Sequence, residues 1–211
     1  MSPSAEDRRQ QILDAAGEVF ARKGFKGASV KELAAAANVS PGLLYWYFQD
    51  KAQIFTALLE QKIAGALGPV SSHVSPDLPP DLYLPAFGKY YVKQIERPGN
   101  NALFRMMLSN SHALPAGVHR VQAQLVGSVL GIVQAYLQRQ IAAGRIRTCN
   151  TEMVARTFMG SIVAYLMLKH VLQDPDAVAL PAETLVDGIS DVVLRGILPG
   201  FPEGDEPEES R

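Results

Sequence analysis

The segment from Ser40 to Phe48 carries the side chains whose chemistry is most informative in this chain. Leu44 and Phe48 are four residues apart, so on a helix they share one face and are expected to point into a core. The other side chains of the segment then face outward, where large aromatic groups are costly unless a partner covers them. Phenol hydroxyls donate hydrogen bonds to phosphates, and apolar atoms pack against thymine methyl groups. The segment therefore predicts contact with double-stranded DNA, through Pro41, Gly42, Leu43, Tyr45, Trp46 and Tyr47.

Two lysines lie near the starts of expected helices, where free backbone N–H groups already favour an anion. Lys51 is in the first turn of the helix after the aromatic segment, and Lys31 is near the start of the helix before it. Gly42 has no side chain at a point where a helix would approach DNA closely. These three residues predict phosphate and groove contacts beside the aromatic segment.

Capping signals divide the first 67 residues into four helices. Gly24 is expected to end the first, because glycine readily adopts the left-handed conformation found at helix ends. Ser29 and Glu32 have the capping-box spacing that begins a second helix, and Ser40 and Asp50 cap the third and fourth. Three helices in this order predict a helix-turn-helix unit whose third helix enters the major groove. The expected helices span about residues 6–23, 29–37, 40–48 and 51–67.

The pattern around these helices resembles the N-terminal domain of the TetR family of bacterial regulators. The matching residues are Phe20, Gly24, Phe25, Ser29, Val30, Leu33, Ala34, Ala37, Asn38, Val39, Ser40, Gly42, Leu44, Tyr45, Tyr47, Phe48, Asp50 and Lys51. Without this pattern, Tyr45 and Trp46 could equally be core residues of an ordinary helical bundle. The resemblance implies phosphate contacts by Ser29, Tyr45, Tyr47 and Lys51. It implies that base edges face Lys31, Pro41, Gly42, Leu43 and Trp46, with Ser40 capping the recognition helix.

Helical patterns continue through the rest of the chain, after a loop at residues 68–80 that is rich in proline and serine. The fold class is therefore all-α, with an N-terminal three-helix helix-turn-helix headpiece and a C-terminal helical domain, about nine helices in total. The predicted domains are residues 1–55 for DNA binding, 56–200 for ligand binding and dimerisation, and 201–211 as a disordered acidic tail. The further helices are expected at about 81–96, 101–109, 118–143, 151–173 and 181–198.

The last two expected helices are the candidates for a dimer interface. The resemblance implies that they pair with those of a second subunit. The helix at 151–173 is apolar nearly all round, and such a helix needs partners on every side; the alternative is the core of a monomer. The last helix carries a wide apolar stripe opposite Asp187, Asp191 and Arg195. The predicted interface residues are Val154, Leu185, Ile189, Val192, Val193 and Ile197.

The resemblance also implies a variable ligand-binding domain, for which bulky and adaptable side chains of the body are the candidates. Binding pockets are mostly apolar with a few polar groups, and the low charge of this region favours an uncharged or lipophilic effector. Each candidate could instead be an ordinary core residue. The predicted pocket residues are Phe87, Tyr90, Tyr91, Phe104, Met107, Phe158 and Tyr165, with Arg105, Asn110, His112, His119 and Gln122 available to orient a polar group.

Other classes of protein find little support. Ser128 does not occupy the serine position of a Gly-x-Ser-x-Gly nucleophile elbow, so Gly127 and Gly131 are expected to permit close helix packing instead. Cys149 is the only cysteine, which excludes an intrachain disulfide and a zinc site built on thiolates. The longest uncharged apolar stretch, at 158–168, is shorter than the ~18 residues of a membrane span. We therefore expect a soluble cytoplasmic protein with no enzymatic activity, metal, cofactor or membrane partner.

The net charge of −1 says nothing against a DNA-binding face, because the tail holds five carboxylates and one arginine and the remainder is net positive. The function predicted is a ligand-responsive, homodimeric regulator, most simply a repressor that a small effector releases from a palindromic operator. The alternative is a ligand-independent architectural protein. The sequence does not distinguish a repressor from an activator.

Overall fold

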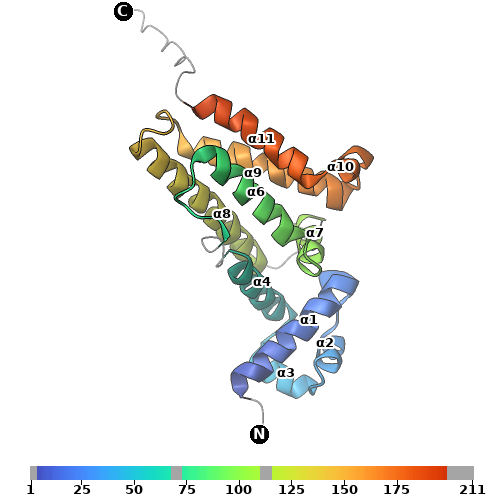
Figure 1. The fold of residues 1–211 in the computed structure, drawn as a ribbon. Helices are drawn as coiled ribbons and strands as arrows, with labels where there is room; N and C mark the ends of the chain where they lie inside the picture. The colour runs from blue at the N-terminus through green and yellow to red at the C-terminus, as the bar shows by residue number, and fades with distance from the viewer. Residues whose placement is uncertain (1–3, 68–72, 110–115, 199–211) are drawn as a thin grey trace, which may run out of the picture.

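The computed structural model describes residues 4–67, 73–109 and 116–198, and all regular structure in these ranges is helical (Figure 1). The predicted all-α fold class is confirmed. The acidic tail, Asn110 and His112 lie outside the described residues. The helices are α1 (Ala5–Gly27), α2 (Val30–Ala36), α3 (Pro41–Tyr47), α4 (Lys51–Leu67), α6 (Pro80–Glu96), α7 (Asn100–Ser109), α8 (Ala116–Ala142), α9 (Thr151–Met167), the π-helical turn η2 (Leu168–Leu172), α10 (Pro175–Ala179) and α11 (Ala182–Ile197).

Local capping explains the first three helices. Ser29 accepts a hydrogen bond from the backbone N–H of Glu32, whose carboxylate accepts from the N–H of Ser29, so the predicted capping box is present. Gly24 has φ +70° and ψ 172°, so it kinks the chain and does not end the helix as predicted, and α1 continues to Gly27. Asn38 also takes a positive φ, 51°, in the turn that separates α2 from α3.

The body differs from the sequence prediction near residue 170. The single helix expected at 151–173 consists of α9 and the π-helical turn η2, and Gln173 follows the turn with φ +53°. After this break, Asp174 and Pro175 begin the short helix α10, which was not predicted; the Asp174 carboxylate accepts from the N–H of Ala177 and proline fits the first helical position.

At Gly88, three helices of the body pack closely together. A Cβ atom there would lie 2.6 Å from Cγ1 of Val186 on α11, and 3.1 and 3.2 Å from side-chain atoms of Ile162 and Phe158 on α9. The expectation that Gly127 and Gly131 permit close helix packing is wrong for the described chain, because a Cβ atom on either residue would meet nothing within 4 Å.

Gly88→Ala is therefore expected to destabilise the protein. The added methyl group must displace the fully buried Val186, and overpacking of this kind typically costs about 1–3 kcal/mol. The measurement is the free energy of unfolding in urea. Gly131→Ala is the matched control, because it adds the same methyl group to open space in a helix and should be neutral or slightly stabilising. Equal stabilities for the two variants would contradict this packing.

Helix α7 joins the two ends of the molecule. Its Leu103 and Met106 are buried in the same apolar cluster as Phe20, Leu44 and Phe55 of α1, α3 and α4. Its Phe104 is buried in the core of the body. Figure 1 shows α7 between α1 and the upper helices. A movement of α7 relative to the body would therefore act directly on the core that supports α3.

Candidate nucleic-acid interface and effector cavity

Helix α3 presents aromatic side chains to solvent. Trp46 is 72% exposed and Tyr45 is 53% exposed, whereas Leu44 and Phe48 are buried, as predicted. Tyr47 is partly buried and its ring packs edge-on against that of Trp46, with centroids 4.7 Å apart. The remaining predicted contact residues on this helix, Pro41, Gly42 and Leu43, are also exposed. In the described chain, the exposed side of α3 is therefore a surface suited to contact with a DNA groove.

The position of α3 is fixed by polar contacts as well as by its buried face. Ser40 caps the helix by accepting a hydrogen bond from the N–H of Leu43 at 3.1 Å. Gln11 of α1 donates to the backbone oxygen of Ala37, in the turn before α3, at 2.7 Å. The guanidinium of Arg9 lies 5.4 Å from the centre of the Phe48 ring, a cation–π distance. These contacts hold the exposed aromatic face at a defined angle to α1.

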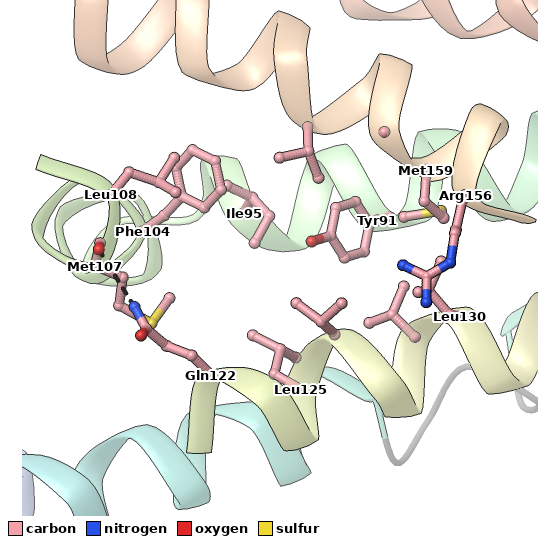
Figure 2. A pocket seen from close by; sticks show the side chains of 14 residues that line it. Tyr91, Ile95, Phe104, Met107, Leu108, Gln122, Leu125, Leu130, Arg156 and Met159 are labelled. Carbon is pink, nitrogen blue, oxygen red and sulfur yellow. Dashed lines mark hydrogen bonds between the residues drawn. The ribbon is translucent and has the colours of Figure 1, made fainter. Parts of the chain in front are cut away.

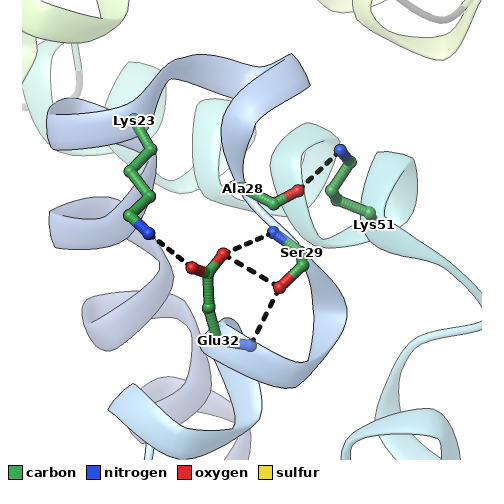
Figure 3. A network of polar contacts seen from close by, with 5 residues as sticks. All are labelled: Lys23, Ala28, Ser29, Glu32 and Lys51. Carbon is green, nitrogen blue, oxygen red and sulfur yellow. Dashed lines mark hydrogen bonds and ion pairs between the residues drawn. The ribbon is translucent and has the colours of Figure 1, made fainter.

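Ser29 lies within a polar network at the start of α2 (Figure 3). Its hydroxyl donates to the Glu32 carboxylate at 2.8 Å and accepts from the Glu32 N–H at 3.3 Å, and Lys23 forms an ion pair with the same carboxylate. The Lys23 ammonium, together with the hydrogen bonds that the Ser29 backbone N–H and hydroxyl donate to the carboxylate, lowers the pKa of Glu32 to about 2. The network is therefore intact near neutral pH and weakens only as the pH falls toward that value. A DNA phosphate bound at Ser29 would share the Ser29 hydroxyl with the N-terminal cap of α2.

Lys51 makes contacts that the sequence pattern did not reveal. Its ammonium donates hydrogen bonds of 2.7 Å to the backbone oxygens of Phe25 and Ala28, and lies 4.7 Å from the centre of the Phe25 ring. Figure 3 shows the side chain reaching from α4 to the end of α1. Because an ammonium has three donors, one N–H stays available for a phosphate. Lys31, the other predicted lysine, is exposed on α2.

Lys51→Met is expected to reduce both stability and DNA binding. Two backbone oxygens lose a charged donor, which should lower the free energy of unfolding by about 1–3 kcal/mol. Loss of one phosphate contact per subunit should also reduce the slope of log affinity against log salt by about 0.9 per subunit. Lys62→Met, on an exposed position of α4, is the control for charge. If the free energy of unfolding falls but the slope of log affinity against log salt is unchanged, Lys51 has a purely structural role and the predicted phosphate contact is wrong.

A hollow of about 460 Å³ lies between α6, α7, α8 and α9 (Figure 2). Four predicted candidates line it: Tyr91, Phe104, Met107 and Gln122. The remaining lining is mostly aliphatic and was not predicted; it consists of Ile95, Leu108, Leu125, Val126, Val129, Leu130, Arg156, Met159, Gly160 and Val163. The volume is within the ~300–1,000 Å³ typical of small-molecule pockets.

Several predicted pocket residues lie elsewhere. Phe87 and Phe158 are buried in the core of the body at 1% and 0% exposure. Tyr165 donates its hydroxyl to the backbone oxygen of Leu180. Tyr90 lies on another side of α6, next to Lys89 and Lys93, because consecutive residues on a helix differ by about 100° in direction. Arg105 is exposed, and His119 is exposed with its ring nitrogen 3.2 Å from the Gln122 side-chain oxygen.

A signal for the missed lining residues exists in the sequence. Leu125, Val129 and Gln122 recur at helical spacing on α8, and Arg156, Met159 and Val163 do so on α9. Such mostly apolar stripes do not tell whether a neighbouring side chain or a void faces them. The position of the hollow therefore depends on how the helices pack, which apolar periodicity alone does not specify.

The predicted interface residues divide between surface and core. Val192 is 70% exposed, and Val154, Leu185 and Ile189 are partly buried. Val193 and Ile197 pack inside the subunit at 8% and 3% exposure, because α11 turns that side of its wide stripe toward α6 and α9. The exposed side of α9 adds small and apolar residues at heptad spacing, namely Met153, Thr157, Gly160, Ala164 and Met167.

Comparison with known proteins agrees with this architecture. The profile of the bacterial regulatory proteins of the tetR family matches residues 12–58, and that of the AefR-like transcriptional repressor C-terminal domain matches residues 83–195. The HTH-type regulator AcrR of Shigella flexneri is 41% identical over 56 residues, 26% of each chain. The chain thus spans about a quarter of AcrR. YhgD of Bacillus subtilis, also an HTH-type regulator, is 22% identical over 90% of this chain and 97% of its own.

Solved structures show the same fold. A TetR-family regulator from Mesorhizobium loti superimposes with a TM-score of 0.78 over 93% of this chain and all of its own, at 18% identity. A helix-turn-helix headpiece on a helical body defines a DNA-binding transcriptional regulator. The chain belongs to the TetR family of bacterial regulatory proteins. Among the described helices, none has the length and hydropathy to cross a bilayer.

Proposed function

We propose that the protein is a homodimeric cytoplasmic repressor that leaves a palindromic operator when a small, largely apolar effector enters the hollow in its body. The observation that carries the DNA-binding part is the exposure of Trp46 and Tyr45 on a capped, rigidly held helix. Exposed aromatic rings are costly on a protein surface unless a partner covers them. A DNA groove offers methyl groups that can pack against such rings and phosphates that can accept their hydrogen bonds.

The exposed side of α9 and α11 supports the dimer. Val192 and Met153 are large apolar side chains at 70% and 56% exposure. On the same two helices, Gly160 and Gly188 carry no side chain, and a Cβ atom on either would meet nothing within 4 Å. Exposed apolar side chains on two neighbouring helices suit contact with a second copy about a two-fold axis. Two copies of α3 would then read two half-sites in successive major grooves.

Helix α7 supports the coupling between effector and operator. Phe104, Met107 and Leu108 line the hollow, and Leu103 and Met106 of the same helix belong to the headpiece core. An effector that fits better after α7 has moved would favour a different headpiece position, and only such unequal binding can shift the equilibrium. Helix α4, which runs from the headpiece to the body, is a second route for the same movement.

Selection of genomic DNA fragments by the purified protein, followed by hydroxyl-radical footprinting, tests the proposal. We expect two protected patches related by a two-fold axis and about one helical turn apart, or a small variant of that spacing. A control with Tyr45, Trp46 and Tyr47 all replaced by alanine should select nothing. Protection without any sequence preference would instead favour a ligand-independent architectural protein.

A further inference from the structure

The hydroxyl group of Tyr91 is a polar group on the wall of the hollow that the protein itself does not satisfy. Figure 2 shows this side chain pointing from α6 into the hollow, with its oxygen directed toward Ile95. Within the described chain, no hydrogen bond to that oxygen is formed. Burial raises the pKa of the Tyr91 phenol to about 12, so its proton is present at physiological pH and can be donated.

The other polar groups of the wall are already paired. Gln122 donates its amide to the backbone oxygen of Met107 at 3.3 Å, and its side-chain oxygen lies 3.2 Å from a His119 ring nitrogen. Arg156 contacts the Glu152 carboxylate through two nitrogens, at 2.9 and 2.8 Å. Among the described residues of the wall, Tyr91 is therefore the neutral polar side chain without a hydrogen-bond partner, and the Arg156 cation is compensated by a neighbouring carboxylate.

The hollow extends to both sides of this hydroxyl. One end is formed by Phe104, Met107 and Leu108 of α7, and the other reaches Leu130 and Arg156 (Figure 2). Apart from the polar groups named above, the described residues of the wall present hydrocarbon, thioether or glycine backbone. A ligand that fills both ends must therefore place apolar parts on either side of whatever group meets Tyr91.

On the basis of the regulator function proposed above, we propose that the effector is an uncharged, elongated molecule with one internal hydrogen-bond acceptor between two apolar arms, as in an ester or ketone, and that Tyr91 selects it by donating to that acceptor. A pure hydrocarbon would leave the hydroxyl unpaired in an apolar surrounding, which disfavours binding. A carboxylate would have to share Arg156 with Glu152 and give up hydration in a largely apolar hollow.

Calorimetric titration with hexyl hexanoate, dodecane and dodecanoate tests this inference. The wild-type protein should bind the ester about tenfold or more tightly than the alkane, since a polar group that binds a substrate polar atom discriminates against its absence. Tyr91→Phe should abolish that preference while leaving the melting temperature of the unliganded protein unchanged or higher, because it removes an unpaired hydroxyl. Tyr90→Phe, at the neighbouring position outside the hollow, should retain the preference.

Two outcomes would overturn the inference. One is a Tyr91→Phe variant that binds the ester as tightly as wild type does. The other is dodecanoate binding that exceeds ester binding and is lost in Arg156→Gln, which would assign the hollow to an anion. The footprint of the unliganded protein is measured in parallel: sequence-specific DNA binding without ester binding refutes only the ligand class, whereas absence of specific DNA binding refutes the regulator function itself.

Discussion

Trp46→Ala is expected to lose operator affinity and base preference without losing stability. Base-edge contacts in the major groove discriminate by about 1–3 kcal/mol each, so two half-sites should together lose roughly a hundredfold in affinity. The side chain is 72% exposed, and its removal therefore creates no cavity in the fold. The measurement is an equilibrium titration of the selected fragment, together with a repeat of the genomic selection.

The control for that variant is Leu82→Ala, which removes another large exposed side chain, on α6 of the body. It should bind the same fragment with wild-type affinity. The assignment of Trp46 to the groove fails if Trp46→Ala selects the same sequence with the same affinity. A lowered melting temperature would show instead that the ring supports the headpiece.

Val192→Glu is expected to separate the dimer. Its side chain lies on the outer side of α11 at 70% exposure, so the fold of one subunit tolerates a carboxylate there. In the proposed interface, two such carboxylates would be buried near the two-fold axis without partners, at a cost of several kcal/mol. We expect the dimer dissociation constant to rise at least about a hundredfold, and operator affinity to fall to that of a single half-site.

Sedimentation equilibrium measures that change directly. Val178→Glu makes the same substitution at a similarly exposed position on α10, outside the proposed interface, and should remain dimeric. A Val192→Glu protein that sediments as the wild type does would place the interface on another face of the molecule.

The headpiece was predictable because its signals are local. Ser29 and Glu32 are three residues apart, and Leu44 and Phe48 are four apart, so helix geometry alone brings each pair together. The outward direction of Trp46 then follows from the inward direction of Leu44. Lys51 shows the limit of such reasoning, because the carbonyl groups that it binds are 26 and 23 residues away in the sequence.

The body was less predictable because the rotation of each long helix depends on its neighbours. Tyr90 and Tyr91 have the same side chain, and only the packing of α6 decides which of them faces the hollow. In the same way, Val192 and Val193 belong to one apolar stripe, yet one is exposed and the other is in the core. Periodicity identifies apolar faces, whereas the packing of α6, α9 and α11 decides what covers them.

Trp46 is the only tryptophan in the chain, so its fluorescence reports the recognition helix without labelling. The most direct test of a DNA-reading α3 is the quenching of this fluorescence by acrylamide, with and without saturating selected DNA. We predict efficient quenching of the free protein, and a shifted emission maximum with strong protection in the complex. Equal accessibility of Trp46 in the free protein and in a complex proven to form would contradict the account.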